Sequence, residues 1–202
     1  MCIRDSYIIF HLIDRCTRWH AGRVIPNKEE ETLTTALAEL WVQIHGPMKE
    51  LFIDGETGIV ASDLSDTYLR RQSIQLRVRA KDQHARFIER RGALLRDQIH
   101  RTESQLEVEG LKVPFPQVLA EAVFCGNALL SVRDSTPYNA VYGRAPRILP
   151  GIDQVSEANS SAEPLPGLIR DTHRLREISV QSMLEGSASA RLGRPLNTRT
   201  TM

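Results

Sequence analysis

Two short apolar segments that each end on an aspartate constrain the fold of this chain more than any other feature. Residues 7–14, YIIFHLID, have the aromatic and β-branched content of a strand and end at Asp14. Residues 50–54, ELFID, predict a second strand that ends at Asp54, directly before the turn sequence GETG. Between them, residues 27–46 predict an amphipathic helix. This order favours a mixed sheet in which the strands ending at Asp14 and Asp54 lie parallel and side by side.

The rest of the chain alternates helical and extended patterns. We predict a strand over residues 18–25, a helix over 62–73, a strand over 74–80, helices over 83–106 and 114–132, a loop over 135–151 and a helix within 168–194. From about residue 152 the sequence is small, polar and proline-containing, which is typical of a linker. The predicted organisation is a core over residues 1–151 that is truncated at its N-terminus, a linker over 152–167, and an exit helix and tail over 168–202 leading toward an absent C-terminal domain.

Composition excludes several classes of protein. With 202 residues, of which 41% are apolar and 25% charged, the chain has room for one soluble domain and an appendage. It has no apolar run long enough to cross a bilayer, so we expect no membrane partner. Its three cysteines are isolated and lack a CxxC spacing, which argues against a disulfide framework or a zinc knuckle and indicates an intracellular protein.

Charge is distributed unevenly along the chain. Residues 70–101 contain ten Lys or Arg and three acids and so carry +7, whereas the whole chain carries only +1. We call this segment the basic block; its cations are Arg70, Arg71, Arg77, Arg79, Lys81, Arg86, Arg90, Arg91, Arg96 and Arg101. Such a run is typical of a surface that binds a polyanion, and a solvated arginine-rich helix is the alternative.

A third acid, Glu89, lies near the start of the helix predicted within the basic block. If that helix crosses the sheet edge, Glu89 meets Asp14 and Asp54, and three carboxylates so close repel one another unless divalent cations bridge them. Oxygen ligands of this kind suit Mg²⁺ or Mn²⁺, and two such ions can support phosphodiester chemistry. Taken singly, each acid is more often a turn cap or a solvated charge.

Four stretches in the correct order resemble the catalytic core of retroviral and long-terminal-repeat retrotransposon integrases. They are HLIDRCTRW around Asp14, HGPMKELFIDGETGI around Asp54, HARFIERRGALLRD around Glu89, and NALLSVRDSTPYNAVYGRAPRILP toward the end of the core. Together they cover about residues 7–150, and Asp54 and Glu89 are 35 positions apart, which is close to the spacing in that family. The resemblance implies an α/β, ribonuclease-H-like fold: a five-stranded mixed sheet flanked by helices, with a C-terminal extension helix.

The resemblance also implies a function. Such a protein is a polynucleotidyl transferase of a retrotransposon polyprotein, which processes the 3′ ends of the element's DNA and transfers them into target DNA. Its Asp14, Asp54 and Glu89 would bind Mg²⁺ or Mn²⁺, and Lys81, Arg86, Arg90 and Arg91 would position phosphates. The implied partners are DNA and further copies of the chain, and the implied location is a cytoplasmic particle and the nucleus of a eukaryotic host.

Departures from the family pattern keep alternatives open. Gly55 replaces the usual Asn after the second acid, and Glu56 then follows as a possible competing ligand. The zinc module and the β-barrel that usually flank such a core have no counterpart here. One alternative is therefore a non-catalytic or degraded nucleic-acid-binding remnant of the same fold. Another is a DDE transposase or ribonuclease H-like nuclease, for which Asp134 and Asp153 are the candidates for a fourth acid.

Overall fold

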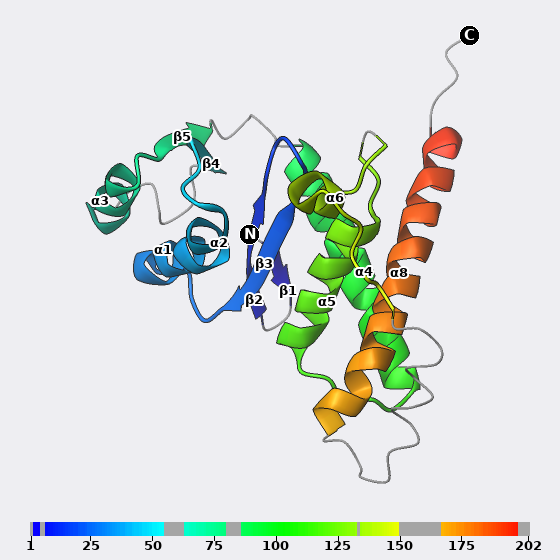
Figure 1. The fold of residues 1–202 in the computed structure, drawn as a ribbon. Coiled ribbons are helices and arrows are strands. Elements are labelled where there is room, and N and C mark those ends of the chain that lie inside the picture. The colour runs from blue at the N-terminus through cyan, green and yellow to red at the C-terminus, as the bar shows by residue number, and fades with distance from the viewer. Residues whose placement is uncertain are drawn as a thin grey trace. The chain divides into compact units, whose positions relative to one another are not determined.

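The computed structural model describes residues 2–4, 7–54, 63–79, 86–132, 134–149 and 167–197. It divides the chain into two compact units (Figure 1). The first unit contains residues 1–13 and 21–92, and the second contains residues 14–20 and 93–202. Each unit has its own buried apolar residues. The first holds the strands and the second is built mainly from helices.

The strands of the described residues form two small sheets. In one sheet the order is β1 (Cys2–Arg4), β2 (Tyr7–Ile13) and β3 (His20–Ile25), and β1 runs antiparallel to β2. The other sheet pairs β4 (Glu50–Asp54) with β5 (Gln75–Arg79) in parallel. All four strands predicted over residues 7–80 are therefore present as local structure.

The prediction of one five-stranded mixed sheet is wrong. Strand β2 was expected to pair with β4, but it is the middle strand of its own sheet, with β1 on one side and β3 on the other. Strand β1, which the sequence did not predict, pairs with the first three residues of β2, Tyr7–Ile9. Strand β4 pairs instead with β5, from Glu50 opposite Gln75 to Asp54 opposite Arg79.

The helix predicted over residues 27–46 is present but contains an irregular turn. It comprises α1 (Glu30–Leu37), the π-helical segment η1 (Ala38–Val42) and α2 (Gln43–His45). Leu33, Leu37 and Ile44 follow one another at helical spacing in the sequence, which predicts one buried face; Leu33 and Leu37 are buried, whereas Ile44 is 61% exposed. A π turn inserts an extra residue and rotates the helical face that follows it. The straight 3.6-residue pattern therefore assigned Ile44 to the wrong face.

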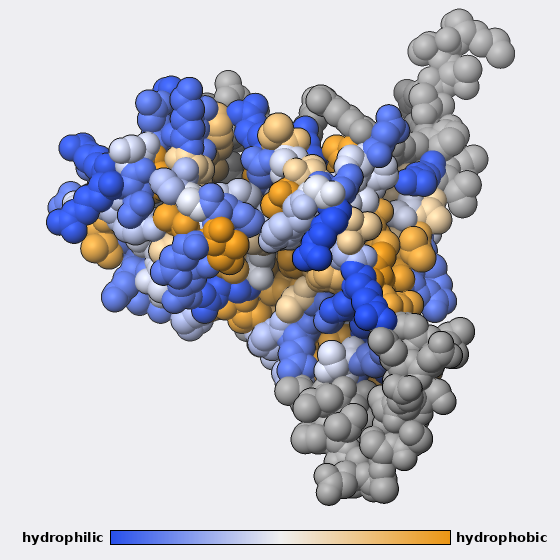
Figure 2. Space-filling model, in the orientation of Figure 1, coloured by the Kyte–Doolittle hydropathy of each residue, from blue (hydrophilic) through white to orange (hydrophobic). Residues whose placement is uncertain are grey.

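One apolar core joins both sheets to the helices of the first unit. Phe10 of β2, Leu37 of α1, Leu51 of β4 and Leu69 of α3 (Asp63–Arg71) belong to it. Burying such side chains contributes about 1.5–3 kcal/mol each to folding. The exposed side of α3 is mostly polar, with Leu64 as an exception, and the space-filling view shows hydrophilic residues over this helix (Figure 2).

The second unit is formed by helices α4 (Arg86–Val108, from Ala93 onward), α5 (Phe115–Leu129), α6 (Pro137–Tyr142) and α8 (Gly167–Asn197). Helix α6 lies where a loop was predicted. Thr136 is its N-cap and accepts a hydrogen bond from the backbone N–H of Asn139 at 3.2 Å, Pro137 is its first residue, and Gly143 ends it with φ of 67°. A Thr-Pro start and a Gly end are ordinary signals for a helix.

Helix α8, which the sequence predicted as an exit helix leading toward an absent domain, packs against α5 (Figure 1). Leu175, Ile178 and Met183 of α8 are each at most 4% exposed. Against α4, the approach at Gly186 is so close that an added Cβ would lie 2.8 Å from Oδ2 of Asp97. The apolar pattern of α8 is irregular because small and polar residues, Ser179 and Ser182, fill part of its buried face. The predicted linker over 152–167 lies almost entirely outside the described residues, and the domain boundary there stays a prediction.

No helix in the described part of the chain is long and apolar enough to span a membrane.

Candidate functional site

Asp14 follows the last residue of β2 and belongs to the second unit. Its Oδ2 accepts hydrogen bonds from the backbone N–H of Cys16 at 3.1 Å, from the backbone N–H of Thr17 at 2.6 Å and from the Thr17 hydroxyl at 2.7 Å. Asp14 therefore caps the turn after the strand, which is the role that strand-end acids most often have. All three bonds end on Oδ2, so the described residues donate no hydrogen bond to Oδ1.

The other two predicted acids belong to the first unit. Asp54 is the last residue of β4, opposite Arg79 in the parallel pair, and its side chain lies outside the described residues. Glu89 lies in the first turn of α4 and is exposed. Glu56 and Asp153 lie outside the described residues, and Asp134 is an exposed loop residue with a left-handed backbone, φ 66°.

Asp14 and Glu89 of the predicted metal site have described side chains. Within the ranges that the structure describes, no group of three or more His, Cys, Asp or Glu side chains is arranged to hold a metal ion. The structure assigns Asp54 and Glu89 to one unit and Asp14 to the other. The donor chemistry still fits, because three carboxylates are the ligands that Mg²⁺ and Mn²⁺ prefer and Asp14 keeps one oxygen outside its turn.

The cations of the basic block have different roles. Arg77 pairs with Glu50 at 3.2 Å, Arg70 with Asp66 at 2.8 Å and Arg101 with Asp97 at 2.9 Å. Arg90 is exposed beside Glu89, as a phosphate-binding residue would be. Arg86 is the first residue of α4, and its side chain lies outside the described residues. Lys81 lies entirely outside them. Part of the +7 is therefore neutralised by local ion pairs.

Arg91 differs from the expectation of a surface phosphate ligand. Its side chain is only 6% exposed, and its three guanidinium nitrogens find no hydrogen-bond partner in the described part of the chain. Burial lowers the pKa of Arg91 to about 10. Burial, followed by the charge of Arg91, lowers the pKa of His11 on β2 to about 4. His11 is therefore neutral at pH 7, so the positive charge of Arg91 is not repelled by a second positive charge on His11.

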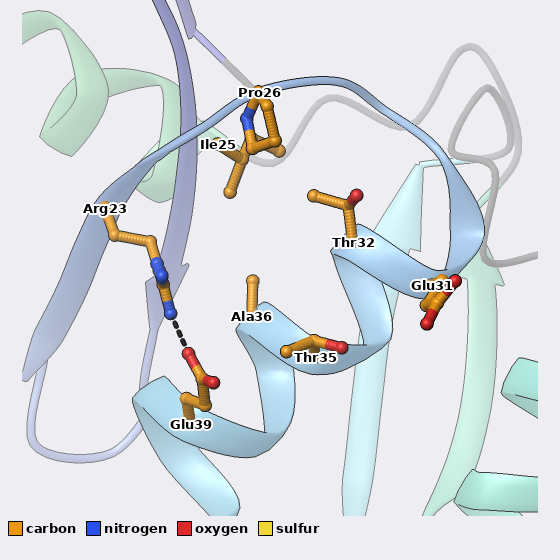
Figure 3. Close-up of a pocket in the computed structure, with 8 residues that line it drawn as sticks. All are labelled: Arg23, Ile25, Pro26, Glu31, Thr32, Thr35, Ala36 and Glu39. Carbon is orange, nitrogen blue, oxygen red and sulfur yellow. Dashed lines mark hydrogen bonds and ion pairs between the residues drawn. The ribbon is translucent and has the colours of Figure 1, made fainter.

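A polar pocket of about 310 Å³ lies between β3 and α1 in the first unit (Figure 3). Arg23 of β3 and Glu39 of η1 point toward each other across it and form an ion pair. Ile25, Pro26 and Ala36 supply apolar surface to its lining. None of the predicted site residues lines this pocket, so it supports no chemistry proposed from the sequence.

Sequence reasoning missed a buried polar pair in the second unit. The backbone N–H of His20 donates to Oδ1 of Asn127 at 3.0 Å, and Nδ2 of Asn127 donates to the His20 carbonyl at 2.8 Å. The His20 ring is also buried, with Nε2 donating to the Val123 carbonyl at 3.1 Å. The pair ties the turn after Asp14 to helix α5. The available signal was Asn127 as the only polar side chain in the apolar stretch AVFCGNALL, residues 122–130.

Sequence comparison adds no relative: no family model matches the chain, and no curated protein matches it either.

Proposed function

We propose that this chain is an integrase-type polynucleotidyl transferase that cuts and joins DNA with the help of divalent cations. The observation that carries the proposal is the position of two acids at strand ends, with Asp14 directly after β2 and Asp54 as the last residue of β4. The exposed Glu89 at the start of α4 supplies a third carboxylate, and Arg90 follows it. The four sequence stretches that resemble integrase cores contain these same residues.

Each residue has a defined role in this proposal. Asp14, Asp54 and Glu89 would bind Mg²⁺ or Mn²⁺, which when bound activates the attacking oxygen and stabilises the leaving oxygen of a phosphodiester. The turn formed by Cys16 and Thr17 fixes the carboxylate of Asp14 through three hydrogen bonds. Arg90 would attract the phosphate backbone beside Glu89. In the first step water would attack near a DNA 3′ end, and in the second the freed 3′-hydroxyl would attack target DNA.

A non-catalytic nucleic-acid-binding remnant is the second candidate, and one observation favours it. Asp14 already has a complete structural role as the cap of its turn, with a shortest contact of 2.6 Å to the Thr17 backbone N–H. An Asp14 whose only role is to cap this turn would make the same hydrogen bonds as an Asp14 that also binds a metal ion. This candidate would bind DNA without cutting it.

A nicking assay separates the two candidates. We expect the whole chain to nick supercoiled plasmid in Mg²⁺ or Mn²⁺, and Asp54→Asn to lower this activity at least about a hundredfold by removing a metal ligand. Asp134→Asn is the matched control: it removes an exposed carboxylate elsewhere, and Asn tolerates the left-handed backbone of this position. Melting temperatures should be unchanged.

Full activity of Asp54→Asn would contradict the metal site. Binding of DNA by the unmodified chain without any metal-dependent nicking would support the remnant. Loss of activity in Asp134→Asn would indicate a fourth acid, as in a ribonuclease H-like nuclease.

A further inference from the structure

Four aromatic rings meet in the second unit. The aromatic cluster consists of Trp19 on the turn after β2, Phe124 on α5, and Tyr138 and Tyr142 on α6. Ring centroids are 5.5 Å apart for Trp19 and Tyr142, 5.9 Å for Trp19 and Tyr138, and 4.8 Å for the two tyrosines. Phe124 lies 6.3 Å from Tyr138. These spacings are typical of aromatic contacts, so the rings hold one another in place.

The aromatic cluster is covered at one end and open at the other. The guanidinium of Arg176 lies 4.1 Å from the centre of the Phe124 ring and covers it. Tyr142 is 47% exposed, and Trp19 and Tyr138 are half-buried. An aromatic side chain retained only for packing is usually covered. Tyr142 is instead partly exposed to solvent while it contacts the rings of Trp19 and Tyr138.

Arginines flank the open end along the chain. Arg15 and Arg18 belong to the turn that carries Trp19, and Arg144 and Arg147 follow Tyr142 closely. Two acids also lie near the cluster along the chain: Asp14, which caps its own turn, and the exposed Asp134, which precedes α6. Arg18 also has a left-handed backbone, φ 64°, directly before Trp19. A residue other than glycine adopts this conformation at a cost of roughly 1–2 kcal/mol, so the rest of the turn must hold it there.

From the ordered rings, the 47% exposure of Tyr142 and the four arginines, we propose that the aromatic cluster binds single-stranded DNA by stacking an unpaired base. Aromatic rings with neighbouring cations are the usual platform for single strands, because every base offers a flat π-face and every nucleotide a phosphate. A base within a duplex is already stacked on both faces and cannot use such a ring. The site should therefore prefer single strands to duplex DNA.

This inference deepens the proposed function, from which it takes DNA as the polymer. Stacking requires no metal ion, so the two can fail separately. A chain that binds single strands in EDTA but never nicks DNA would retain this site and lose the proposed chemistry. A chain that nicks DNA, but whose binding of single strands is unaffected by substitution of the ring, would keep the proposed chemistry and lose this site.

Fluorescence anisotropy of a labelled twelve-nucleotide oligo(dT), in EDTA with the whole chain, tests the site. We expect Tyr142→Ala to weaken binding about five- to hundredfold, the range of one stacked base. Tyr142→Phe keeps the ring and loses only the hydroxyl, so it should bind like the unmodified chain. Both substitutions are at an exposed position and should leave the fold intact. Equal affinity of the Ala and Phe variants, or a preference for the matched duplex, would overturn the proposal.

Trp19 provides a second readout inside the aromatic cluster. The chain has two tryptophans, so Trp41→Phe leaves Trp19 as the single reporter. A base stacked beside Tyr142 lies close to Trp19, because the two rings are 5.5 Å apart, and should quench its fluorescence. Oligo(dT) should quench Trp19 with the midpoint seen in the anisotropy titration. Binding without quenching would place the DNA elsewhere on the chain and contradict the assignment, and the anisotropy test stands even if Trp41→Phe folds poorly.

Discussion

Arg91 has an environment opposite to the one its sequence suggests. It follows Glu89 and Arg90 in a run of cations, yet helix α4 turns it inward, to 6% exposure, beside the neutral His11. A one-residue step along a helix rotates the side chain by about 100°, which is enough to separate the exposed Arg90 from the buried Arg91. The charge of a basic segment therefore overstates the number of cations that can contact a phosphate.

Substituting the two neighbours separates their roles. Arg91→Met keeps the volume and removes a buried charge that finds no hydrogen-bond partner among the described residues, so we expect the free energy of unfolding to rise by about 1–3 kcal/mol. Arg90→Ala should change stability by less than about 0.5 kcal/mol and reduce the salt dependence of DNA binding by roughly one phosphate contact. Urea unfolding and binding titrations at several salt concentrations measure both. A strong loss of stability in Arg91→Met would show that the guanidinium has an acidic partner in solution.

His11 should make stability depend on pH. Its pKa is lowered from 6.5 to about 4 by burial and by Arg91, so the unfolded chain takes up a proton at a higher pH than the folded chain does. The stability associated with neutral His11 is fully present above about pH 6.5 and is lost as the pH falls toward 4. Between pH 7 and pH 5 the expected loss is about 2 kcal/mol.

Urea unfolding at pH 5, 6 and 7 measures this loss. His11→Gln removes the titrating group and should flatten the profile in this window. Measurements go no lower than pH 5 because the carboxyl of Glu109, whose pKa is lowered to about 2 by hydrogen bonds from Arg174 and Gln105, adds its own dependence below 4.5. An unchanged slope in His11→Gln would assign the pH dependence to another group.

At the scale of elements, the contact between α5 and α8 shows how a helix with a weak apolar pattern becomes part of a core. Arg176 of α8 binds both carboxylate oxygens of Glu121 on α5, and its second terminal nitrogen donates to the Ile148 carbonyl at 3.2 Å. The side chain of Glu121 is only 13% exposed. Gln98 of α4 adds a bond to the Ser179 carbonyl at 3.3 Å. Polar contacts of this kind leave no periodic apolar signal in the sequence.

A double-mutant cycle measures the contribution of this ion pair. Arg176→Met should lower the free energy of unfolding by roughly 2–3 kcal/mol, because Glu121 remains as a mostly buried carboxylate without its partner. Adding Glu121→Met should recover most of that loss, because the remaining pair is apolar. Urea unfolding of the four proteins gives the coupling free energy. If the loss of unfolding free energy in the double variant equalled the sum of the losses in the two single variants, the ion pair would contribute nothing to holding α8 on α5.

For the whole molecule, local structure could be predicted from the sequence and pairing could not. Strand β4 and helix α5 were predicted to within a few residues because their patterns depend on near neighbours. The sheet was predicted wrongly because the edges of β2 are occupied through contacts that no local pattern records. The same limit applies to the site: Asp14 was recognisable at a strand end, but its turn bonds, the burial of Arg91 and the pair of His20 with Asn127 depend on where distant segments meet.

The last prediction concerns whether the chain can fold without α8. A chain ending at residue 150 would expose the face of α5 that α8 covers and would lose the partner of Glu121. We expect this truncated chain to unfold at a lower urea concentration than the full chain and to bind a hydrophobic dye.

A protease site inserted between Asn159 and Ser160, in the predicted linker, gives the matched control, because cleavage there keeps both helices. The cleaved fragments should elute together in gel filtration, since the buried Leu175, Ile178 and Met183 still hold α8 in place. A truncated chain as stable as the full one, or fragments that separate on cleavage, would show that α8 is an appendage, as its sequence alone suggested.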